Sequence, residues 1–342
     1  MKKRDLTIDI AKGICIYLVV LGHCHNAGSI RHYIYLFHMP FFFFVSGFFF
    51  NRKDGFVNFL KAKIKRLLIP FFIYWLFSII ASEGIGILQT KSLIIPDIHI
   101  GTIWFLISLW NMYVIHYFVS KLSCIWGGIS SIISLGIAYY LVANNVDLPL
   151  YLTQTFMAYP FFIFGSFFYK SKVFSVNGVR NSCYEVLQSR KVARTLFIIA
   201  LLFMSLYPFE QLDIKELELP NVFSLLIGAF SGIFMIIIVS RFIFEVRFMA
   251  FMKKTLSELG KYSIHILGFH VVVLTLAYYI VTPLIIRIEK ILMLPVQTGE
   301  DIKFNSPYLA IFMAVWISYI SMKMGEYSEK KWPKLWGIQK HI

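Results

Sequence analysis

This sequence contains few charged residues and no long polar segment. Only 15% of its 342 residues are charged, whereas 58% are hydrophobic; soluble proteins are about 45–50% apolar. Apolar stretches close to the roughly 20 residues that cross a bilayer recur along the chain, separated by short polar breaks. The composition leaves no room for a soluble catalytic domain and indicates an integral membrane protein.

Cysteines and repeats are also scarce. The sequence has no tandem repeat of fixed period and no low-complexity tract, which argues against a repeat array. Its cysteines lie mainly in or beside apolar segments without paired spacing, so neither a disulfide framework nor a zinc knuckle is indicated. The four cysteines are Cys15, Cys24, Cys124 and Cys183.

Acidic residues are also few. The chain has 18 Asp and Glu residues against 33 Lys and Arg residues, which gives a net charge of +15. In a membrane protein such an excess reflects cytoplasmic loops that follow the positive-inside rule and contact anionic lipid. We therefore expect the lipid bilayer as a partner, and no nucleic acid.

The apolar segments predict ten membrane spans with both termini in the cytoplasm. The first apolar run lacks a small-residue cleavage site and carries Asp9 and Lys12, so we expect a retained span instead of a signal peptide. Only six of the 33 Lys and Arg residues fall on the predicted outer side, a bias that supports this topology. The spans are predicted at residues 7–26, 32–51, 67–88, 102–119, 124–143, 151–169, 195–209, 222–240, 262–283 and 307–322.

The predicted fold class is therefore all-α, a polytopic integral membrane protein with about ten transmembrane helices. We expect one transmembrane domain over residues 1–322 and a short basic cytoplasmic tail over residues 323–342 that rests at the interface. Residues 52–66 carry apolar side chains at helix-like intervals among cations. This pattern predicts an amphipathic helix along the inner interface, before the chain turns inward at Pro70.

The first span contains two ionisable side chains that are costly in lipid. Lys12 and His23 are eleven residues apart, which places them about 20° apart around a helix and about 16 Å apart along it. Ionisable groups at this depth usually face a bundle interior or a wet cavity, so their shared face is a candidate site. Neutral imidazole accepts a proton from a hydroxyl at about pH 7, which makes His23 the candidate general base.

These residues also have simpler interpretations. His23 can be a buried histidine bonded to a neighbouring carbonyl. Asp9, three residues before Lys12 on the same face, can form a local ion pair with it while Lys12 extends toward the headgroups. A metal site is a further alternative, but the spacing of the available ligands matches no strong metal signature, so no metal is expected. Those ligands are His23, Cys24, His25, His32 and His38.

The second span combines His38 and Pro40 with Ser46 and Gly47. Pro40 interrupts helical hydrogen bonding, so the carbonyls before it can line a cavity, and His38 is expected in an irregular turn. Gly47 permits close approach of another helix, and packing of small residues at a proline kink is the simpler explanation of Ser46. The phenylalanine run at residues 41–44 is either lipid-facing or packing bulk.

Two later spans supply further candidates. Trp104 opens the fourth span at the outer boundary, where it either belongs to an aromatic belt or stacks on a sugar. His265 and His270 in the ninth span are five residues apart, about 140° around a helix, so at most one of them is expected to meet His23.

Together these residues resemble the membrane-bound acyltransferase family 3, the integral O-acyltransferases that modify bacterial surface polysaccharides and related sugars. The likeness covers most of the chain. It rests on five motifs in order, which are Lys12 through His23, Phe37-His38-Met39-Pro40 through Ser46-Gly47, Lys65-Arg66-Leu67-Leu68-Ile69-Pro70, Trp104-Phe105-Leu106, and Gly260-Lys261-Tyr262-Ser263 through His270.

The resemblance implies a ten-helix bundle in the bacterial inner membrane that moves an acyl group, usually acetyl, from cytoplasmic acyl-CoA to a sugar hydroxyl. By this likeness His23 would be the catalytic histidine, and Lys12 would stand where the family commonly has an arginine. Because lysine lacks the planar fork of arginine, we expect Lys12 to act with Asp9 by electrostatic positioning.

The other expected roles follow the same likeness. Acetyl-CoA is expected as the donor substrate, with its phosphates attracted by basic residues at the inner face. The expected acyl-CoA-binding residues are Lys61, Lys65 and Arg66. The acceptor pocket is expected to be lined by His38, Ser46, Trp104 and His270.

A transporter or flippase for a lipid-linked sugar is the alternative function, since it also needs ten or more helices with buried charges. Such transporters often show related halves with interrupted helices, whereas the polar residues here gather in spans one and two. A non-enzymatic sensor or scaffold is a third hypothesis, for which the chain offers little soluble surface. Direct transfer and a covalent acyl-enzyme on His23 or Ser46 are both compatible with the sequence, as are acetyl and succinyl groups.

Overall fold

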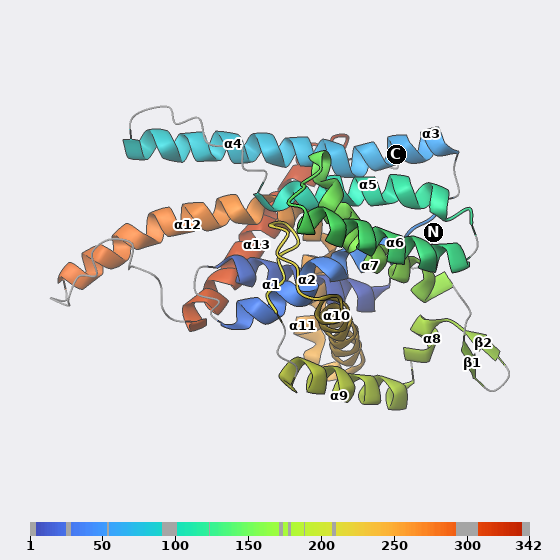
Figure 1. Cartoon of the computed structure of the whole chain (residues 1–342). Helices are drawn as coiled ribbons and strands as arrows, with labels where there is room; N and C mark the ends of the chain where they lie inside the picture. Colours follow the sequence, from blue (N-terminus) through green and yellow to red (C-terminus); the bar gives the residue numbers. More distant parts are fainter. Residues whose placement is uncertain are drawn as a thin grey trace.

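The computed structural model is almost entirely helical (Figure 1). It describes residues 5–24, 29–52, 55–90, 101–122, 124–170, 174–176, 179–187, 189–206, 210–291 and 307–336. The α-helices are α1 (Leu6–His23), α2 (Ser29–Phe48), α3 (Phe56–Lys63), α4 (Ile69–Thr90), α5 (Trp104–Val119), α6 (Cys124–Ala143), α7 (Leu152–Lys170), α8 (Cys183–Leu187), α9 (Arg190–Leu206), α10 (Val222–Glu245), α11 (Ala250–Lys261), α12 (Ser263–Ile291) and α13 (Pro307–Lys331).

Short elements connect these helices. A π-helix, η1 (Ile64–Leu68), joins α3 to α4, and a two-stranded antiparallel hairpin follows α7, with Phe174 paired to Asn181. The remaining elements are the 3₁₀ turns η2 (Gly101–Ile103), η3 (Pro149–Tyr151) and η4 (Arg247–Met249), and the strands β1 (Phe174–Val176) and β2 (Val179–Asn181).

Each of the ten predicted spans coincides with a helix, so the prediction of a helical, multi-pass membrane protein is confirmed. Within the described residues, five helical stretches are long and apolar enough to cross a membrane. A sixth is added if α11 and the first part of α12, bent by 84°, count as one broken span. The number ten and the cytoplasmic placement of both termini stay predictions. The five stretches are Leu6–His23, Phe56–Ala81, Gly101–Val119, Ile125–Ala143 and Val222–Glu245.

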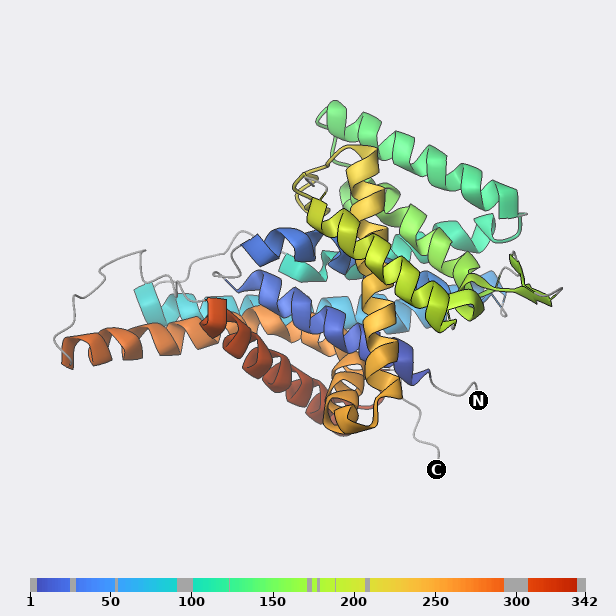
Figure 2. The same cartoon turned by 90° about the horizontal axis from the view of Figure 1, so that it is seen from below.

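Helix α1 occupies the centre of the bundle, where it packs against α2, α10, α11, α12 and α13 (Figures 1 and 2). Glycines allow the closest contact in this packing, between α1 and α11. A Cβ atom at Gly13 would overlap the Leu256 carbonyl of α11, and one at Gly260 of α11 would overlap the Asp9 carbonyl. The two backbones therefore touch directly, as small residues allow in membrane bundles.

Helix α2 packs on α7 in the same way. A Cβ atom at Gly47 would overlap the Phe162 carbonyl, which confirms the predicted close approach of another helix at this glycine. Phe41, Phe43 and Phe44 are fully buried, so this aromatic run is packing bulk and not a lipid-facing surface. Pro40 lies inside α2, which continues through it, so the expected irregular turn around His38 is wrong.

The predicted turn at Pro70 is also wrong. Helices α3 and α4 follow one another through η1 as one stretch, and they lie in line in Figure 1. The π-helix ends at Leu68, two residues before Pro70, and its wider turn accommodates a ring that would clash in a regular α-helix. The basic segment is thus the first part of a long helix instead of a separate interfacial one.

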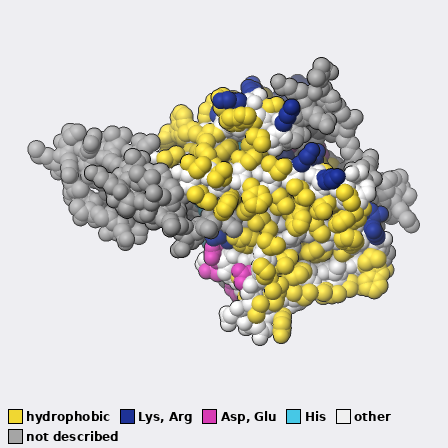
Figure 3. All heavy atoms as spheres, turned by 90° about the horizontal axis from the view of Figure 1, so that it is seen from above, with side chains coloured by type: hydrophobic (Ala, Val, Ile, Leu, Met, Phe, Trp, Pro, Cys, Tyr) yellow, Lys and Arg dark blue, Asp and Glu magenta, His cyan; other side chains and the backbone are white. Residues whose placement is uncertain are grey.

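The surface seen in Figure 3 is mostly hydrophobic. Phe72 and Ile80 of α4 and Ile132 and Tyr140 of α6 are between 58% and 73% exposed, which suits a surface surrounded by lipid. Helix α13 continues to Lys331, so the predicted domain boundary between residues 322 and 323 falls inside a helix.

Candidate active site

Two neighbouring cavities lie along α1. The histidine cavity has a volume of about 40 Å³, and the lysine cavity has a volume of about 210 Å³. Met39 of α2 and Leu267 of α12 line both, so the two cavities meet at these side chains. Lys12 lines one cavity and His23 the other, which agrees with their predicted shared face on α1.

The histidine cavity is built around the C-terminal end of α1. His23 is the last residue of that helix, and its ring centroid lies 5.2 Å from that of His270 and 6.2 Å from that of Tyr35. Tyr35 in turn lies 4.8 Å from His38. Within the described residues His23 makes no hydrogen bond, so the simpler interpretation of a carbonyl-bonded histidine has no support there.

The hydrogen bonds of the other two histidines fix their tautomers. Nδ1 of His38 lies 2.8 Å from the Ile34 carbonyl, and Nδ1 of His270 lies 2.9 Å from the Ile266 carbonyl. Because a carbonyl only accepts, each Nδ1 must carry the proton and each neutral ring keeps Nε2 as an acceptor. Nε2 of His270 is buried and has no hydrogen-bond partner among the described residues. An unmatched acceptor beside His23 is suited to a hydroxyl donor.

His265 and His270 point to different parts of the bundle, as their spacing predicted. Only His270 contacts His23. His265 instead lies between Tyr74, whose hydroxyl is 2.8 Å from Nδ1, and Glu329, whose carboxylate is 3.0 Å from Nε2. His265 therefore belongs to the packing of α4, α12 and α13, away from the candidate site.

Trp104 is a wall of the histidine cavity. Its side chain is only 3% exposed and its ring lies among Phe43 and Tyr151, so the aromatic-belt alternative is wrong for this residue. Thr102, two residues earlier, also lines the cavity and donates a hydrogen bond to the Leu267 carbonyl at 3.2 Å.

A loop between α9 and α10 closes the histidine cavity and was not predicted as part of a site. Asp213 and Lys215 both line the cavity. The Asp213 carboxylate accepts backbone hydrogen bonds from Lys215 and Glu216 at 2.9 and 3.3 Å, while burial raises the pKa of Asp213 above its usual value. In the sequence this loop appears only as an acidic break between spans, and nothing there indicates that it shares a cavity with His23.

The lysine cavity joins α1 and α2 at the other end of the shared face. Lys12 Nζ forms an ion pair with Asp9 Oδ1 at 2.8 Å, so the predicted local pair exists, and Lys12 also faces the cavity. The Lys12 side chain is 21% exposed and that of Asp9 only 7%. The ammonium is therefore held in place by a buried carboxylate.

Ser46 lines this cavity beside Tyr113 of α5. The Tyr113 hydroxyl donates to the Ser46 carbonyl at 3.2 Å, and Lys63 Nζ sits 3.3 Å from the centroid of the Tyr113 ring. A cation over a tyrosine face is an attractive contact. It ties the basic segment of α3 and η1 to the wall of the cavity.

The predicted acyl-CoA-binding residues lie at this same end. Lys61, Lys65 and Arg66 are exposed, and Leu67, directly after Arg66, lines the lysine cavity. The structure thus places these cations next to the lysine cavity. Of the four predicted pocket residues, His38 and Trp104 line the histidine cavity and Ser46 lines the lysine cavity, whereas His270 lines neither and contacts His23. In the part of the chain that the structure describes, no three His, Cys, Asp or Glu side chains are grouped to hold a metal ion.

Similarity to known proteins extends over nearly the whole chain. A family model described as an acyltransferase domain matches residues 5–322. Nodulation protein NolL of Mesorhizobium japonicum is 29% identical over 189 residues, which cover 48% of this chain and 48% of NolL. The chain therefore spans about half the length of this curated relative. No solved structure gives a significant match.

Proposed function

This chain belongs to the acyltransferase family 3, and from that membership we propose that it moves an acyl group, acetyl in the simplest case, from cytoplasmic acyl-CoA to a hydroxyl of a sugar or surface polysaccharide. One observation supports this most directly. His23 and Lys12 line two adjoining cavities on one face of a helix that spans the membrane. Such an arrangement allows donor and acceptor to approach from opposite ends.

The donor is proposed to enter at the basic end. Lys61, Lys65 and Arg66 offer exposed cations for the CoA phosphates. The pantetheine arm then extends through the lysine cavity, which is open and mostly apolar apart from Lys12 and Ser46. Because about 16 Å of helix separate Lys12 from His23, Lys12 acts on the path of the donor and not on the reacting carbonyl.

The chemical step is proposed at the histidine cavity. An imidazole nitrogen of His23 takes the proton of the acceptor hydroxyl, and the hydroxyl oxygen attacks the thioester carbonyl carbon. When the tetrahedral intermediate collapses, the carbon–sulfur bond breaks, the His23 imidazolium gives its proton to the leaving sulfur, and CoA departs as the thiol with His23 neutral again. The buried surroundings of His23 exclude water, which would otherwise hydrolyse the thioester.

The acceptor requires more room than the described cavity gives. A volume of about 40 Å³ holds a few water molecules at most, since one water needs about 10–15 Å³ of such space. We propose that residues 212–215, which form one wall, move when a sugar enters. Asp213 and Lys215 would then be placed beside its hydroxyls, and Trp104 would offer an aromatic face.

A His23→Ala variant tests this function. The protein is purified in lipid nanodiscs with acetyl-CoA and a panel of sugars, and both free CoA thiol and acetylated sugar are measured. Because general-base catalysis contributes about 10²–10⁴-fold, we expect the rate to fall at least about 100-fold. A variant that folds and acetylates at the normal rate would remove His23 from the mechanism.

His32→Ala is the matched control, since His32 is a histidine of α2 that lines neither cavity. Its rate should equal that of the unaltered protein. Counterflow of a lipid-linked sugar by the unaltered protein, without release of CoA thiol, would support the transporter alternative instead.

A further inference from the structure

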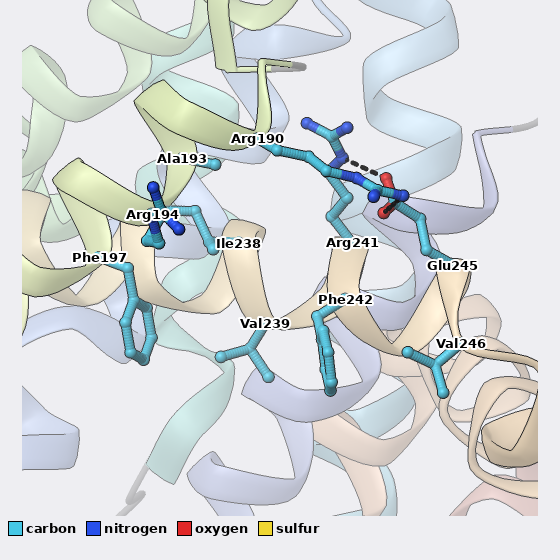
Figure 4. Close-up of a pocket in the computed structure, with 10 residues that line it drawn as sticks. All are labelled: Arg190, Ala193, Arg194, Phe197, Ile238, Val239, Arg241, Phe242, Glu245 and Val246. Carbon is cyan, nitrogen blue, oxygen red and sulfur yellow. Dashed lines mark hydrogen bonds and ion pairs between the residues drawn. The ribbon is translucent and has the colours of Figure 1, made fainter.

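A third cavity lies between α9 and α10, away from both cavities of the candidate site. It has a volume of about 650 Å³, and none of the described residues that line it lines the other two (Figure 4). Phe197 of α9 and Ile238, Val239 and Phe242 of α10 form its apolar wall. We refer to it as the α9–α10 groove.

Three arginines line this groove. Arg190 and Arg194 come from the first turns of α9, and Arg241 comes from near the C-terminal end of α10. Arg190 and Arg241 lie together beside the carboxylate Glu245, whereas Arg194 lies apart from them, next to Phe197 and Ile238 (Figure 4). Glu245 pairs with Arg241 at 2.8 Å and with Arg190 at 3.3 Å. The groove therefore keeps an excess of positive charge.

Arg194 carries the part of this charge that no described side chain neutralises. It is exposed and lines the groove, and it has no ion pair or hydrogen bond among the described residues. Arg241, by contrast, also donates to the Leu187 carbonyl at 2.7 Å, so it fastens α8 to α10. Arg194 is thus the arginine that is available to a ligand.

The groove also lies where lipid surrounds the protein. Helix α10 is apolar and long enough to cross the membrane, and Phe242, which lines the groove, is 56% exposed. The outer side of α9 exposes Ile198, Leu202 and Phe203. A ligand in the groove therefore has hydrocarbon on one side and arginine side chains beside it.

We propose that the α9–α10 groove is a binding site for an anionic phospholipid. Its phosphate would accept hydrogen bonds from Arg194, because guanidinium groups match phosphate oxygens in geometry and charge. One acyl chain would lie along Phe197, Val239 and Phe242. Basic pockets between transmembrane helices bind such headgroups by the same combination of charge and apolar contact.

An Arg194→Gln variant tests the site. The full-length protein is purified in a mild detergent and mixed with phosphatidylglycerol or phosphatidylcholine, and bound lipid is counted by native mass spectrometry. We expect the apparent affinity for phosphatidylglycerol to fall about tenfold in Arg194→Gln, which equals about 1.4 kcal/mol. Affinity for phosphatidylcholine should stay unchanged.

Lys191→Gln is the matched control. It removes one positive charge from an exposed position in the same turn of α9 without touching the groove. It should keep the affinity for phosphatidylglycerol. If both variants lose the same affinity for phosphatidylglycerol, the lipid is held by a general attraction of opposite charges. If Arg194→Gln keeps the affinity of the unaltered protein, the groove binds no anionic lipid. Either result overturns the proposal.

Two alternative occupants of the α9–α10 groove, CoA and a second copy of this chain, would give different results. Displacement of phosphatidylglycerol by added CoA would indicate a donor site, and a dimer lost in Arg194→Gln would indicate a second copy of this chain. Both results would overturn the lipid proposal without bearing on the His23 test, because the groove shares no residue with the candidate site.

Discussion

At the scale of single residues, the pair of Asp9 and Lys12 shows how a charge is kept in α1. The ammonium lines the lysine cavity and its partner carboxylate is nearly buried. The pair can therefore have a structural role and a functional role at once. These two roles make different predictions for single and double variants.

Replacing Lys12 with Met leaves the Asp9 carboxylate in its buried position without the Lys12 ammonium. Breaking a buried pair costs about 3–5 kcal/mol, and because Lys12 is partly exposed we expect about 1–3 kcal/mol here. The double variant Asp9→Asn/Lys12→Met should regain most of this stability but not the acyltransferase activity. Thermal unfolding midpoints and release of CoA thiol measure the two effects.

For both the structural role and the functional role of this ion pair, one result of these measurements would contradict it. If the double variant has an unfolding midpoint as low as that of Lys12→Met, loss of the ion pair does not explain the lower stability of Lys12→Met. If the double variant is active, Lys12 does not guide the donor.

At the scale of elements, direct backbone contact between helices organises the bundle. Gly13 of α1 lies against the Leu256 carbonyl of α11, with no space for a Cβ atom. Gly136 of α6 has nothing within 4 Å of the place where a Cβ atom would lie. These two glycines, both in apolar helices, should respond in opposite ways to the same substitution.

We expect Gly13→Ala to lower the free energy of unfolding by about 1–3 kcal/mol, because the added methyl pushes α1 and α11 apart. Gly136→Ala should leave the free energy of unfolding unchanged or raise it by up to about 1 kcal/mol, because alanine favours the helix and its methyl group meets no neighbour. Thermal unfolding of the two purified variants measures this difference. Equal midpoints would contradict direct contact between the α1 and α11 backbones.

The prolines show where element prediction failed. Pro40 and Pro70 each predict a break, yet α2 continues through Pro40 and the π-helix η1 ends two residues before Pro70. Neighbouring helices satisfy backbone groups that a proline frees, and near Pro70 the π-helix supplies a widened turn. Whether a proline bends a helix depends on these surroundings, which local sequence does not contain.

At the scale of the whole molecule, the end of the described chain packs back onto the bundle. The Trp336 ring lies 4.5 Å from that of His265 and 5.6 Å from that of Tyr74, and Glu329 contacts His265. The predicted interfacial tail therefore includes residues that join α4, α12 and α13.

Trp336→Ala should lower the free energy of unfolding by about 1–3 kcal/mol, less than for a fully buried tryptophan because Trp336 is half-buried. Trp332→Ala is the control, since Trp332 is 47% exposed and, among the described residues, its ring contacts Tyr327 and Lys331 alone. Its unfolding midpoint should stay within error of the unaltered protein. A tail that merely rests at the interface would give two equal midpoints.

The sequence by itself determined the helical membrane-embedded class, the places of the ten helical segments and the common face of Lys12 and His23. These features follow from hydrophobic length and from the 3.6-residue period, which act within one segment. Only the tertiary structure decided that His270 and not His265 meets His23, that Trp104 is a cavity wall, and that Asp213 and Lys215 close the site. Such pairings depend on which helices and loops pack together, and packing joins residues that are far apart in the chain.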